Sequence, residues 1–579
     1  MASSKLVVLL VACVAVCLVA PASAFFFRSY NPNERASGSG STCAICTVMM
    51  GLVDQLAVVH HESNTAAFKR LCAAYPQPYS RLCNTFRLRY GFKLVRQLDK
   101  GDTPDVACMG SEFCAPSQCH LYPLKSREDL APAHIAELIA MPGPSAKQDI
   151  ETKGVCSIPF MGTVICNMLN LQAFSIQYPK DDKDKDAFSK SNILRGADWR
   201  GKDCGEGNAA IYPGRKPNQG DNFVDSNCNG IKGFDAESQM TWEEKLCGDS
   251  QAKGVIALGD SVTANFHVPA EWFNATILSK EWLENMTYLM DNSMNWPHTS
   301  LYTGSVNVSW PIVDGHTDSL YLRMRERNLC NHRDYQNIGF NGARTTDSAK
   351  LTESLKRSPV QDKPGLVMYS YVGNDVCKYH VNPALSDVTT PAQAVKGLLD
   401  TMALLNTKMA PLSHVIVVAI ADARILYEGL IDRIHPFGAT MEDVTFNDFY
   451  NWLECLDISP CPGWLTNNAT VREGTAQVVR DINAALENFV NENPNRFSNF
   501  EMIFVPNPVD EVVAAHVAQG GEPWELVELF DGFHPNQKAH ALVAEVVWEK
   551  LVQEHPHVLG PVNPNNHRIR QMFGDQGGH

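Results

Sequence analysis

The sequence has no excess of basic residues. Among its 579 residues, 49 lysines and arginines stand against 64 aspartates and glutamates, a formal net charge of −15 at pH 7. Nucleic-acid binding draws most of its affinity from basic surface, so we expect no nucleic-acid partner. An anionic substrate would have to be met by a local group of basic side chains. Hydrophobic residues at 44% and charged residues at 20% are typical of a globular chain.

Long apolar runs are also scarce. After residue 24 we find no stretch that is apolar for long enough to span a bilayer, and we expect a soluble mature protein. Residues 1–24 resemble a secretory signal, with Lys5, an apolar run over Leu6 to Val19 and the cleavage pattern Ala22-Ser23-Ala24. An uncleaved membrane anchor is the alternative. We expect a secreted protein, with lysosomes or cytoplasmic vesicles as a second destination.

Cysteine, in contrast, is plentiful. Of 18 cysteines, Cys13 and Cys17 lie in the signal segment, which leaves an even number for the mature chain. An even number in a secretory chain predicts disulfides throughout. The same compartment permits N-glycosylation of N-x-S/T motifs. These motifs begin at Asn274, Asn285, Asn307 and Asn468.

Six cysteines near the start stand among apolar residues at helical spacing. They are Cys43, Cys46, Cys72, Cys83, Cys108 and Cys114. Their spacing resembles that of saposin B-type modules, and we assign residues 39–122 to such a domain. Six cysteines permit 15 connectivities, and the resemblance implies the pairs Cys43–Cys114, Cys46–Cys108 and Cys72–Cys83. It also implies apolar surface for a membrane or micelle; a purely structural disulfide bundle is the alternative.

Cys119 falls outside these six. Its candidate partners are Cys455, which we adopt, or Cys461, with a nearby bridge to Cys156 or Cys166 as the alternative. Residues 123–155 carry charge, proline and glycine, and we interpret them as a linker that contains a proteolytic processing site. A disulfide from Cys119 to a distant cysteine would keep the two pieces together.

Residues 156–250 are acidic and rich in asparagine. Alternating carboxylate and amide oxygens in a turn-rich loop suit Ca²⁺, which takes six to eight oxygen ligands. The candidate ligands are Asp182, Asp184, Asp186, Asp198, Asp203, Asn208, Asp221, Asp225, Asn227 and Asn229. No EF-hand register fits. The region instead resembles calcium-binding repeats of secreted proteins with a Cys204–Cys228 clip, so we expect structural calcium. For Asp182 to Asp186, a solvated charge run is an equal alternative.

From Gly254 onward, short apolar runs alternate with helical stretches. We expect strands at residues 254–258, 365–371, 415–420 and 502–505, and helices at residues 391–406 and 475–491. This alternation predicts an α/β fold with a parallel sheet and helices on both faces.

Ser261 follows the first of these strands in Gly259-Asp260-Ser261. Open α/β sheets bind ligands at the carboxyl ends of their strands. A serine hydroxyl needs a base with an oriented partner; His534 is the candidate base and Asp531 its partner. Taken singly, the serine would be a turn residue, the histidine a surface residue, and Asn374 a helix cap.

Four motifs occur in order along residues 251–579. They are Gly259-Asp260-Ser261, Asn337 to Gly342, Gly373-Asn374-Asp375 and Asp531 to His534. The set resembles that of the SGNH (GDSL-type) hydrolases, which implies a flavodoxin-like, three-layer fold. It also implies an oxyanion hole formed by the N–H groups of Ser261 and Gly342 and the side-chain amide of Asn374. The second glycine of G-x-S-x-G is absent, which disfavours the larger α/β-hydrolase fold.

The order of modules and the closing segment Phe573 to His579 extend the resemblance to a family of two-domain lipid esterases. Members remove secondary acyl chains from the lipid A of bacterial lipopolysaccharide, and are cut into small and large subunits joined by a disulfide. Lipopolysaccharide and other acylated lipids are the implied partners. The alternatives are a phospholipase or sugar O-deacetylase on the same scaffold, and a lipid-transfer protein with an inactive hydrolase domain.

Overall fold

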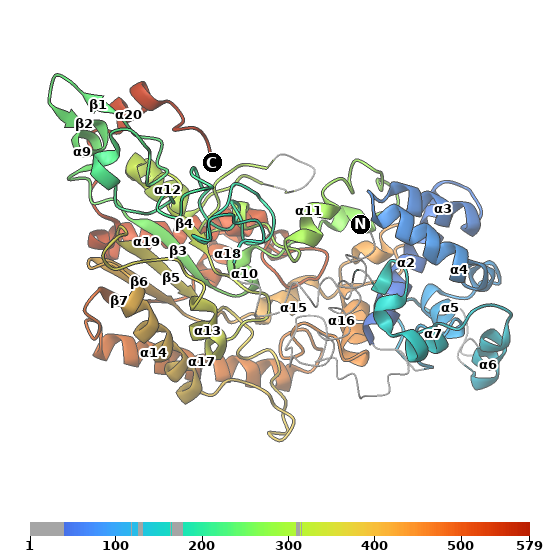
Figure 1. The fold of residues 1–579 in the computed structure, drawn as a ribbon. Coiled ribbons are helices and arrows are strands. Elements are labelled where there is room, and N and C mark those ends of the chain that lie inside the picture. Colours follow the sequence, from blue (N-terminus) through green and yellow to red (C-terminus); the bar gives the residue numbers. More distant parts are fainter. Residues whose placement is uncertain are drawn as a thin grey trace. The chain divides into compact units, whose positions relative to one another are not determined.

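The computed structural model describes residues 40–116, 119–124, 131–162, 164, 178–308, 313 and 315–579. The expected signal segment and Cys166 lie outside the described residues. The chain divides into two compact units (Figure 1). The first comprises Met1–Ala173, Ala270–Met290 and Asp432–Pro460, and the second comprises Phe174–Pro269, Asp291–Ile431 and Cys461–His579.

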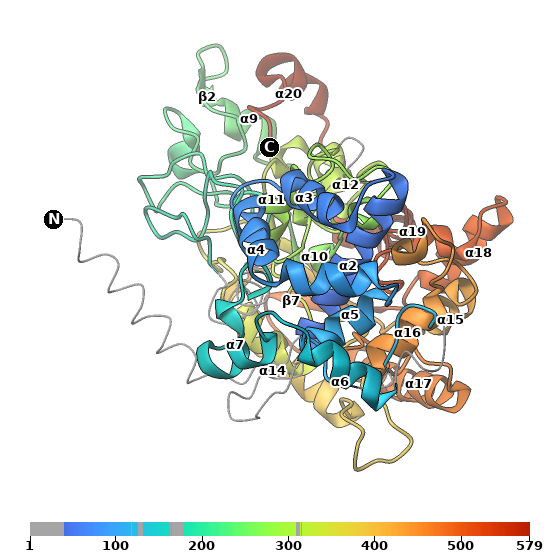
Figure 2. The same ribbon diagram turned by 90° about the vertical axis from the view of Figure 1, so that its right-hand side faces the viewer.

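The first unit is built from helices and cross-linked by disulfides. Its early helices are α2 (Gly40–Val59), α3 (Asn64–Ala74), α4 (Tyr79–Asp99) and α5 (Pro104–Gly110). Figure 2 shows these helices packed against one another. Cys46–Cys108 joins α2 to α5, Cys43–Cys114 joins α2 to the residues after α5, and Cys72–Cys83 joins α3 to α4. The expected small, all-α, disulfide-linked domain is therefore confirmed.

Helix α2 corrects one expectation from the sequence. Its 20 residues are long and apolar enough that, by length and composition alone, this helix could cross a membrane. However, 61% of its apolar window is buried inside the protein, and Cys43 and Cys46 are tied to other parts of the bundle. Such burial and cross-linking are typical of the core helix of a folded domain.

Residues 123–155 are not a simple linker in their described part. They form α6 (Pro132–Ala140) and α7 (Ala146–Lys153), and η2 (Val155–Ser157) follows. Ile135 and Leu138 of α6 are buried, and the buried carboxylate of Asp149 in α7 binds Arg89 Nη2 at 2.6 Å. The proline and glycine residues that suggested a linker lie between these helices.

Two later segments belong to the helical unit, although the sequence places them in the esterase domain. They contain η4 (Ala270–Phe273), most of α11 (Met286–Asp291), η8 (Pro436–Gly438) and α16 (Phe446–Cys455). The Cys119–Cys455 disulfide ties α16 to this unit. Gln55 Nε2 also donates a hydrogen bond to the Phe437 carbonyl at 2.6 Å. These contacts are between residues far apart in sequence, which explains why local patterns do not reveal them.

The second unit contains the expected parallel sheet. Its five strands are β4 (Tyr335–Asn337), β3 (Gly254–Gly259), β5 (Gly365–Ser370), β6 (Ser413–Val418) and β7 (Phe500–Val505), hydrogen-bonded in that order and all parallel. Four of these strands match predicted apolar runs. The sequence did not predict β4, because three residues with polar Gln336 and Asn337 give no strand pattern.

Helices cover both faces of this sheet (Figure 1). Alternate residues of the strands pack against opposite layers of helices. Ile256 and Val367 pack with α13 (Ser348–Thr352), α14 (Pro391–Lys408) and α17 (Ala469–Glu492). Val255 and Leu366 pack on the other face with α12 (Leu320–Arg327) and α19 (Gln537–Glu554). Burial on both faces explains the unbroken apolar runs. The predicted three-layer α/β fold is confirmed.

The remaining elements of the second unit lie around this sheet. They are η3 (Asn218–Asp221), β1 (Phe234–Asp235), β2 (Met240–Thr241), α9 (Trp242–Cys247), α10 (Ser261–Ala264), η5 (Pro297–Thr299), η6 (Leu329–Asn331), η7 (Thr345–Asp347), α15 (Arg424–Leu430), α18 (Val509–Ala518), η9 (Pro523–Leu526), η10 (Pro556–Leu559) and α20 (Asn566–Phe573). The disulfides in this unit are Cys204–Cys228, Cys247–Cys330 and Cys377–Cys461. The sequence did not predict the last two pairs.

Candidate active site

Ser261 lies at the carboxyl end of β3, where the strand turns directly into α10. The Asp260 side chain caps this short helix by accepting a hydrogen bond from the Val262 N–H at 3.0 Å. A Cβ at Gly259 would lie 2.1 Å from Thr263 Oγ1 and 2.2 Å from the Ser370 carbonyl. Only glycine fits such a close approach. The turn therefore fixes the position of Ser261 relative to β5.

His534 meets Ser261 across 273 positions of sequence. Its Nε2 lies 2.8 Å from Ser261 Oγ, and its Nδ1 lies 2.5 Å from Asp531 Oδ2. Asp531 Oδ1 accepts the backbone N–H groups of Phe533 and His534. With Nδ1–H donating to the carboxylate, Nε2 can accept the serine proton. The three predicted catalytic residues thus form a continuous hydrogen-bonded series.

The charges around this series favour an ionised Asp531. Burial alone would raise the pKa of Asp531, but the His534 charge and the hydrogen bonds from His534 and Phe533 outweigh it and hold this pKa below its ordinary value. His540 is also buried, and burial together with the His534 charge lowers its pKa to about 3. His540 is therefore neutral and does not compete for the catalytic proton.

The predicted oxyanion residues lie in loops that are linked to the turn at Ser261. The Asn374 side-chain amide donates to the Ala343 carbonyl at 3.2 Å and to Asp260 Oδ2 at 3.4 Å. Gly342, directly before Ala343, has a φ of +79°, which glycine adopts without strain. The loops that carry Gly342 and Asn374 are thus fixed next to the residues that flank Ser261.

Asp260 and Asp375 hold these loops together, although neither was predicted to have a role in the site. Asp260 Oδ2 accepts the Val372 N–H at 2.7 Å, and burial raises the pKa of Asp260 to about 6. Asp375 accepts the Thr345 N–H and its hydroxyl at 3.0 and 2.7 Å. No helix begins at Asn374 in the described chain, so it is not a helix cap. Both carboxylates lie inside motifs that the sequence did reveal.

One group of the predicted metal-ligating acids converges. Carboxylate oxygens of Asp182, Asp184 and Asp186 lie within 4.8 Å of one another. Burial and the charges of Asp203, Asp184 and Asp182 raise the pKa of Asp186 to about 7. Burial, with the charges of Glu206 and Asp184, raises that of Asp203 to about 6. These five acids are therefore electrostatic neighbours, and Glu206 is a member that the sequence analysis missed.

Several oxygens of this acidic group are buried without a hydrogen-bond donor among the described residues. They are both carboxylate oxygens of Asp184, Asp186 Oδ2, Asp203 Oδ2 and Glu206 Oε2. Asp186 and Asp203 are each 1% exposed. Buried carboxylates without a donor are costly, and a hard cation would satisfy them. The donor set therefore fits calcium.

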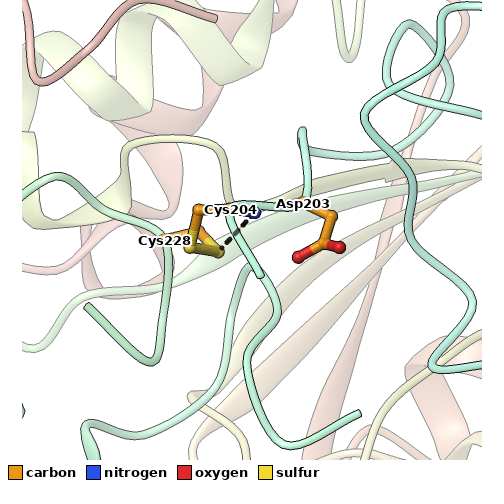
Figure 3. A group of neighbouring side chains, drawn as sticks. All are labelled: Asp203, Cys204 and Cys228. Carbon is orange, nitrogen blue, oxygen red and sulfur yellow. Dashed lines mark hydrogen bonds between the residues drawn. A yellow bond between two sulfur atoms is a disulfide. The ribbon is translucent and has the colours of Figure 1, made fainter. Parts of the chain in front are cut away.

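The Cys204–Cys228 disulfide lies beside Asp203 (Figure 3). The Cys204 N–H donates to Cys228 Sγ at 3.1 Å. Both sulfurs come within 4.8 Å of a carboxylate oxygen of Asp203. Sulfur in a disulfide is not a thiolate and does not act as a metal ligand. The bridge therefore holds the loop rather than an ion.

The other predicted ligands are engaged in different ways. Asp221 is fully buried and its Oδ2 has no donor among the described residues, whereas Asp225 accepts the N–H groups of Asn229 and Gly230. The side-chain amides of Asn227 and Asn229 donate to Glu243, a buried acid that the sequence analysis missed.

Asp198 and Asn208 contact residues outside the acidic group. Asp198 Oδ2 lies 3.7 Å from His298 Nδ1, and Asn208 Oδ1 accepts the Ala210 N–H. Neither residue has a buried oxygen without a donor among the described residues, and their role as calcium ligands stays a prediction.

A different cluster at the amino-terminal ends of β6 and β7 contains His414, Glu501 and His557, whose ligand atoms also lie within 4.8 Å. His557 Nε2 binds Glu501 Oε2 at 2.9 Å. Lys253 Nζ lies 3.1 Å from His414 Nδ1, and burial lowers the Lys253 pKa only to about 8. A protonated lysine donates to Nδ1, which leaves the proton on Nε2. Ligating histidines instead donate from their second nitrogen, so this cluster is not assigned to a metal.

The four sequons differ in exposure. Asn468 and Asn307 are exposed, whereas Asn274 and Asn285 are half-buried. Asn468 caps α17 through Oδ1, which accepts the Thr470 N–H at 3.0 Å. Its Nδ2, the atom that would carry a glycan, is not used in this cap.

Comparison with known proteins agrees with this architecture. Residues 255–547 match the family model of GDSL-like lipases and acylhydrolases, and residues 42–167 match that of the saposin-like domain. Together with the site at the carboxyl end of β3, these matches define the class: the protein is an ester hydrolase of the GDSL type, joined to a saposin-like module.

Relatives in mammals narrow the assignment. Acyloxyacyl hydrolase of Oryctolagus cuniculus is 38% identical over 544 residues, 93% of each chain. That of Mus musculus is 37% identical over 558 residues, 95% of this chain and 96% of the relative. That of Homo sapiens is 36% identical over 547 residues, 93% of this chain and 94% of the relative. The chain belongs to the acyloxyacyl hydrolase family.

The Asp531–His534 contact leads to a first prediction. Asp531→Asn retains the acceptor for Phe533 and His534 N–H but presents an amide donor to His534 Nδ1, which favours the wrong tautomer. We expect kcat on a soluble ester to fall by about 10⁴-fold with little change in KM. Asp387→Asn, at an exposed carboxylate paired with Arg344, is the control and should keep full activity. Wild-type kcat in Asp531→Asn would contradict the assignment.

Proposed function

We propose that this enzyme releases secondary fatty acyl chains from the lipid A of bacterial lipopolysaccharide. An acyloxyacyl bond is an ester between one fatty acid and a hydroxyl group on another acyl chain. Its hydrolysis yields a free fatty acid and restores that hydroxyl. The relatives' name supports the bond type, and the 2.8 Å contact between Ser261 Oγ and His534 Nε2 is the observation that carries the chemistry.

The mechanism follows from the order of the hydrogen bonds. Ser261 Oγ attacks the ester carbonyl while His534 Nε2 takes its proton. The imidazolium, stabilised by Asp531, then gives this proton to the departing hydroxyl oxygen. A water molecule repeats the sequence on the acyl-enzyme: His534 accepts its proton, and the collapse of the second tetrahedral species returns a proton to Ser261 and releases the fatty acid.

The negative oxygen of each tetrahedral species would be stabilised by three donors. We assign the N–H groups of Ser261 and Gly342 and the side-chain amide of Asn374 to this role. In the resting site both N–H groups of the Asn374 amide are engaged, by the Ala343 carbonyl at 3.2 Å and by Asp260 Oδ2 at 3.4 Å. The amide would exchange the longer of these two hydrogen bonds for one to the oxyanion. Losing one such donor typically reduces kcat by about 10²–10³-fold.

The direct test uses lipopolysaccharide and Ser261→Ala. We expect wild type to release the secondary fatty acids, identified by mass spectrometry, and to leave the acyl chains attached to the glucosamine sugars in place. Ser261→Ala should reduce release to background, a loss of at least about 10⁴-fold, while lipid binding persists.

Parallel incubations with phospholipid and with an O-acetylated sugar test the two alternative esterase activities. If fatty acid were released faster from phospholipid than from lipopolysaccharide, phospholipid would replace lipid A as the substrate class. Full activity of Ser261→Ala would remove the mechanism, and an inactive wild-type enzyme that still transfers lipid between vesicles would favour a lipid-transfer role.

The helical unit offers a surface for the lipid aggregate. On α4, Leu88 is 75% exposed and Phe92 is 67% exposed, one turn apart on the same side of the helix. Arg81 and Arg96 are exposed on either side of them. Exposed apolar residues flanked by arginine are typical of helices that rest on anionic membranes. We assign this face, Arg81 to Arg96 of α4, to contact with the lipid surface.

If this face of α4 contacts lipid, removing its apolar side chains should weaken binding to vesicles. Leu88→Ser combined with Phe92→Ser removes two side chains that would each gain up to about 1.5–3 kcal/mol on burial in lipid. We expect binding to phosphatidylglycerol vesicles in a flotation assay to weaken by at least about tenfold, with unchanged kcat on a soluble ester. Val360→Ser, at an apolar side chain that is 76% exposed in the second unit, is the matched control. Equal weakening by both variants would contradict the assignment.

We also propose that calcium stabilises the acidic region. Asp184, Asp186, Asp203 and Glu206 would hold the ion, because each has a buried oxygen that lacks a donor among the described residues. Asp182, whose oxygens accept the Lys185 and Ala187 N–H groups, would add a carboxylate oxygen from the same group. A bound cation would neutralise the negative charge of these acids and would cross-link the loop of residues 181–206. Asp221 is a candidate for a further ion, with Asp225 beside it.

Chelation tests this part of the proposal. Calcium at about 100 times its dissociation constant adds about 2.7 kcal/mol to folding stability, so EDTA should lower the melting temperature by about 2–4 °C. Calcium should restore it. Asp203→Asn should lower the melting temperature in calcium and show a smaller response to EDTA, whereas exposed Asp387→Asn should behave as wild type. No shift on chelation of the wild-type protein would remove the calcium site.

Processing and localisation complete the proposal. A secreted or lysosomal enzyme cut between Cys119 and the second unit would keep its pieces joined through the Cys119–Cys455 disulfide, which spans 336 positions. The disulfides in both units suit that oxidising route.

A further inference from the structure

A buried arginine lies beside the loop that carries Gly342, and the mechanism above gives it no task. Arg195 is 4% exposed. Its Nη1 donates a hydrogen bond to the Gly339 carbonyl at 2.9 Å. Its guanidinium carbon lies 4.1 Å from the centre of the Trp199 ring and 6.0 Å from that of Phe340. No carboxylate forms an ion pair with it among the described residues.

A buried cation without an acid is an unfavourable arrangement for stability. Burial lowers the pKa of Arg195 to about 9, and the charge of the neighbouring Arg200 adds to this effect. A hydrocarbon side chain could fill the same space against Trp199 without that desolvation. The hydrogen bond to Gly339 is the interaction that only a polar side chain supplies here.

Gly339 itself packs directly against the turn at Ser261. A Cβ at this position would lie 2.7 Å from the Ala264 nitrogen and 3.1 Å from the Asp260 carbonyl oxygen. The Gly339 N–H donates to Asn337 Oδ1 at 2.9 Å, and the Phe340 N–H donates to the Gly259 carbonyl at 3.0 Å. Because Arg195 donates to the Gly339 carbonyl, the N–H and C=O of Gly339 and the N–H of Phe340 are all hydrogen-bonded.

The segment that carries Arg195 is in turn fixed to the edge of the sheet. The Asn337 N–H donates to the Trp199 carbonyl at 2.7 Å, and the Gly201 N–H donates to the Tyr335 carbonyl at 2.9 Å. Arg200 pairs with Gln336 of β4 in an antiparallel bridge. Arg195 therefore reaches Gly339 from a segment that is hydrogen-bonded to the strand preceding the loop.

We propose that Arg195 is a positioning residue for ester hydrolysis: it fixes the Gly339–Gly342 loop so that the Gly342 N–H meets the negative oxygen of the tetrahedral species. The proposal rests on the oxyanion role of Gly342 stated above. Oxyanion donors act only when they are held at hydrogen-bonding distance from the developing charge, and a displacement of about 1 Å can reduce the rate about 10²-fold. Arg195 touches the loop and not the substrate.

The test compares Arg195→Met with Arg195→Lys. Methionine keeps apolar contact with Trp199 but removes the hydrogen-bond donor and the charge. Lysine keeps the donor and the charge. On a soluble p-nitrophenyl ester, we expect Arg195→Met to lower kcat by about 10- to 100-fold with KM within twofold of wild type. Arg195→Lys should recover most of this loss. Arg472→Met is the matched control, because Arg472 also stacks on a ring, that of Tyr427, and donates to a carbonyl, that of Thr466, at 2.7 Å.

A short alkylboronic acid separates positioning from general loosening of the fold. It forms a tetrahedral adduct with the active-site serine and places an oxygen where the oxyanion forms. Its inhibition constant should rise in Arg195→Met by about the same factor as kcat falls, while the melting temperature stays within a few degrees. The pH dependence of kcat/KM should not shift, because His534 is untouched.

Each outcome decides between the alternatives. Unchanged kcat, a change in KM alone, or unchanged boronic acid affinity in a folded Arg195→Met would overturn the proposal. Should that variant not fold, Arg195→Gln, which keeps an amide donor without the charge, is held to the same criteria. A wild-type protein that hydrolyses no ester would refute the proposed function, and this inference with it; an active wild type beside an unaffected variant refutes only the role of Arg195.

Discussion

The hydrogen bond between Ser261 Oγ and His534 Nε2 is the interaction on which the rest of this site depends. The sheet makes it possible, because β3 is buried on both faces and ends at Gly259, where the backbone is packed closely against Thr263 and Ser370. Helix α19, which begins three residues after His534, packs on the sheet through Ala544 and Val547 and fixes the other partner. A buried strand and a buried helix thus flank the hydroxyl and the imidazole, and the turn from Asp531 to His534 is closed by the hydrogen bonds to Asp531.

Buried carboxylates organise the loops around this bond. Asp260 and Asp375 accept backbone amides from neighbouring loops, and Asp531 accepts those of its own turn. Each makes hydrogen bonds that water would otherwise supply, which explains why such charges are tolerated inside the protein. The acidic region differs, because Asp184, Asp186 and Asp203 keep oxygens without a donor among the described residues. The first group orients catalytic parts, and the second is suited to a cation.

Patterns in the sequence predicted those features that depend on neighbouring residues. Apolar runs gave β3, β5, β6 and β7, and the motifs gave Ser261 and His534. Strand β4 was not predicted, because Gln336 and Asn337 are buried polar residues whose hydrogen-bond partners are distant in sequence. Gln336 Nε2 donates to the Lys356 carbonyl, and Asn337 Nδ2 donates to the Thr263 carbonyl and to Thr303 Oγ1. Polar side chains that are satisfied by tertiary contacts carry no periodic signal.

Features set by tertiary contacts could not be predicted in the same way. The inclusion of residues 432–460 in the helical unit depends on contacts such as Gln55 to Phe437. Glu206 and Glu243 stand outside the runs of Asp and Asn that drew attention, and only the fold brings them to those residues. Asp198 and Asn208 lie inside the runs but turn to other partners. Composition identified the acidic region, whereas only the folded structure shows which of its acids converge.

The most direct measurement of the central claim is peptide mapping after reaction with a fluorophosphonate, which modifies serines activated by a neighbouring base. We expect one adduct, on the peptide that contains Ser261, and we expect this labelling to be lost in a folded His534→Ala variant. An adduct on another serine, or undiminished labelling of Ser261 without the His534 imidazole, would contradict it.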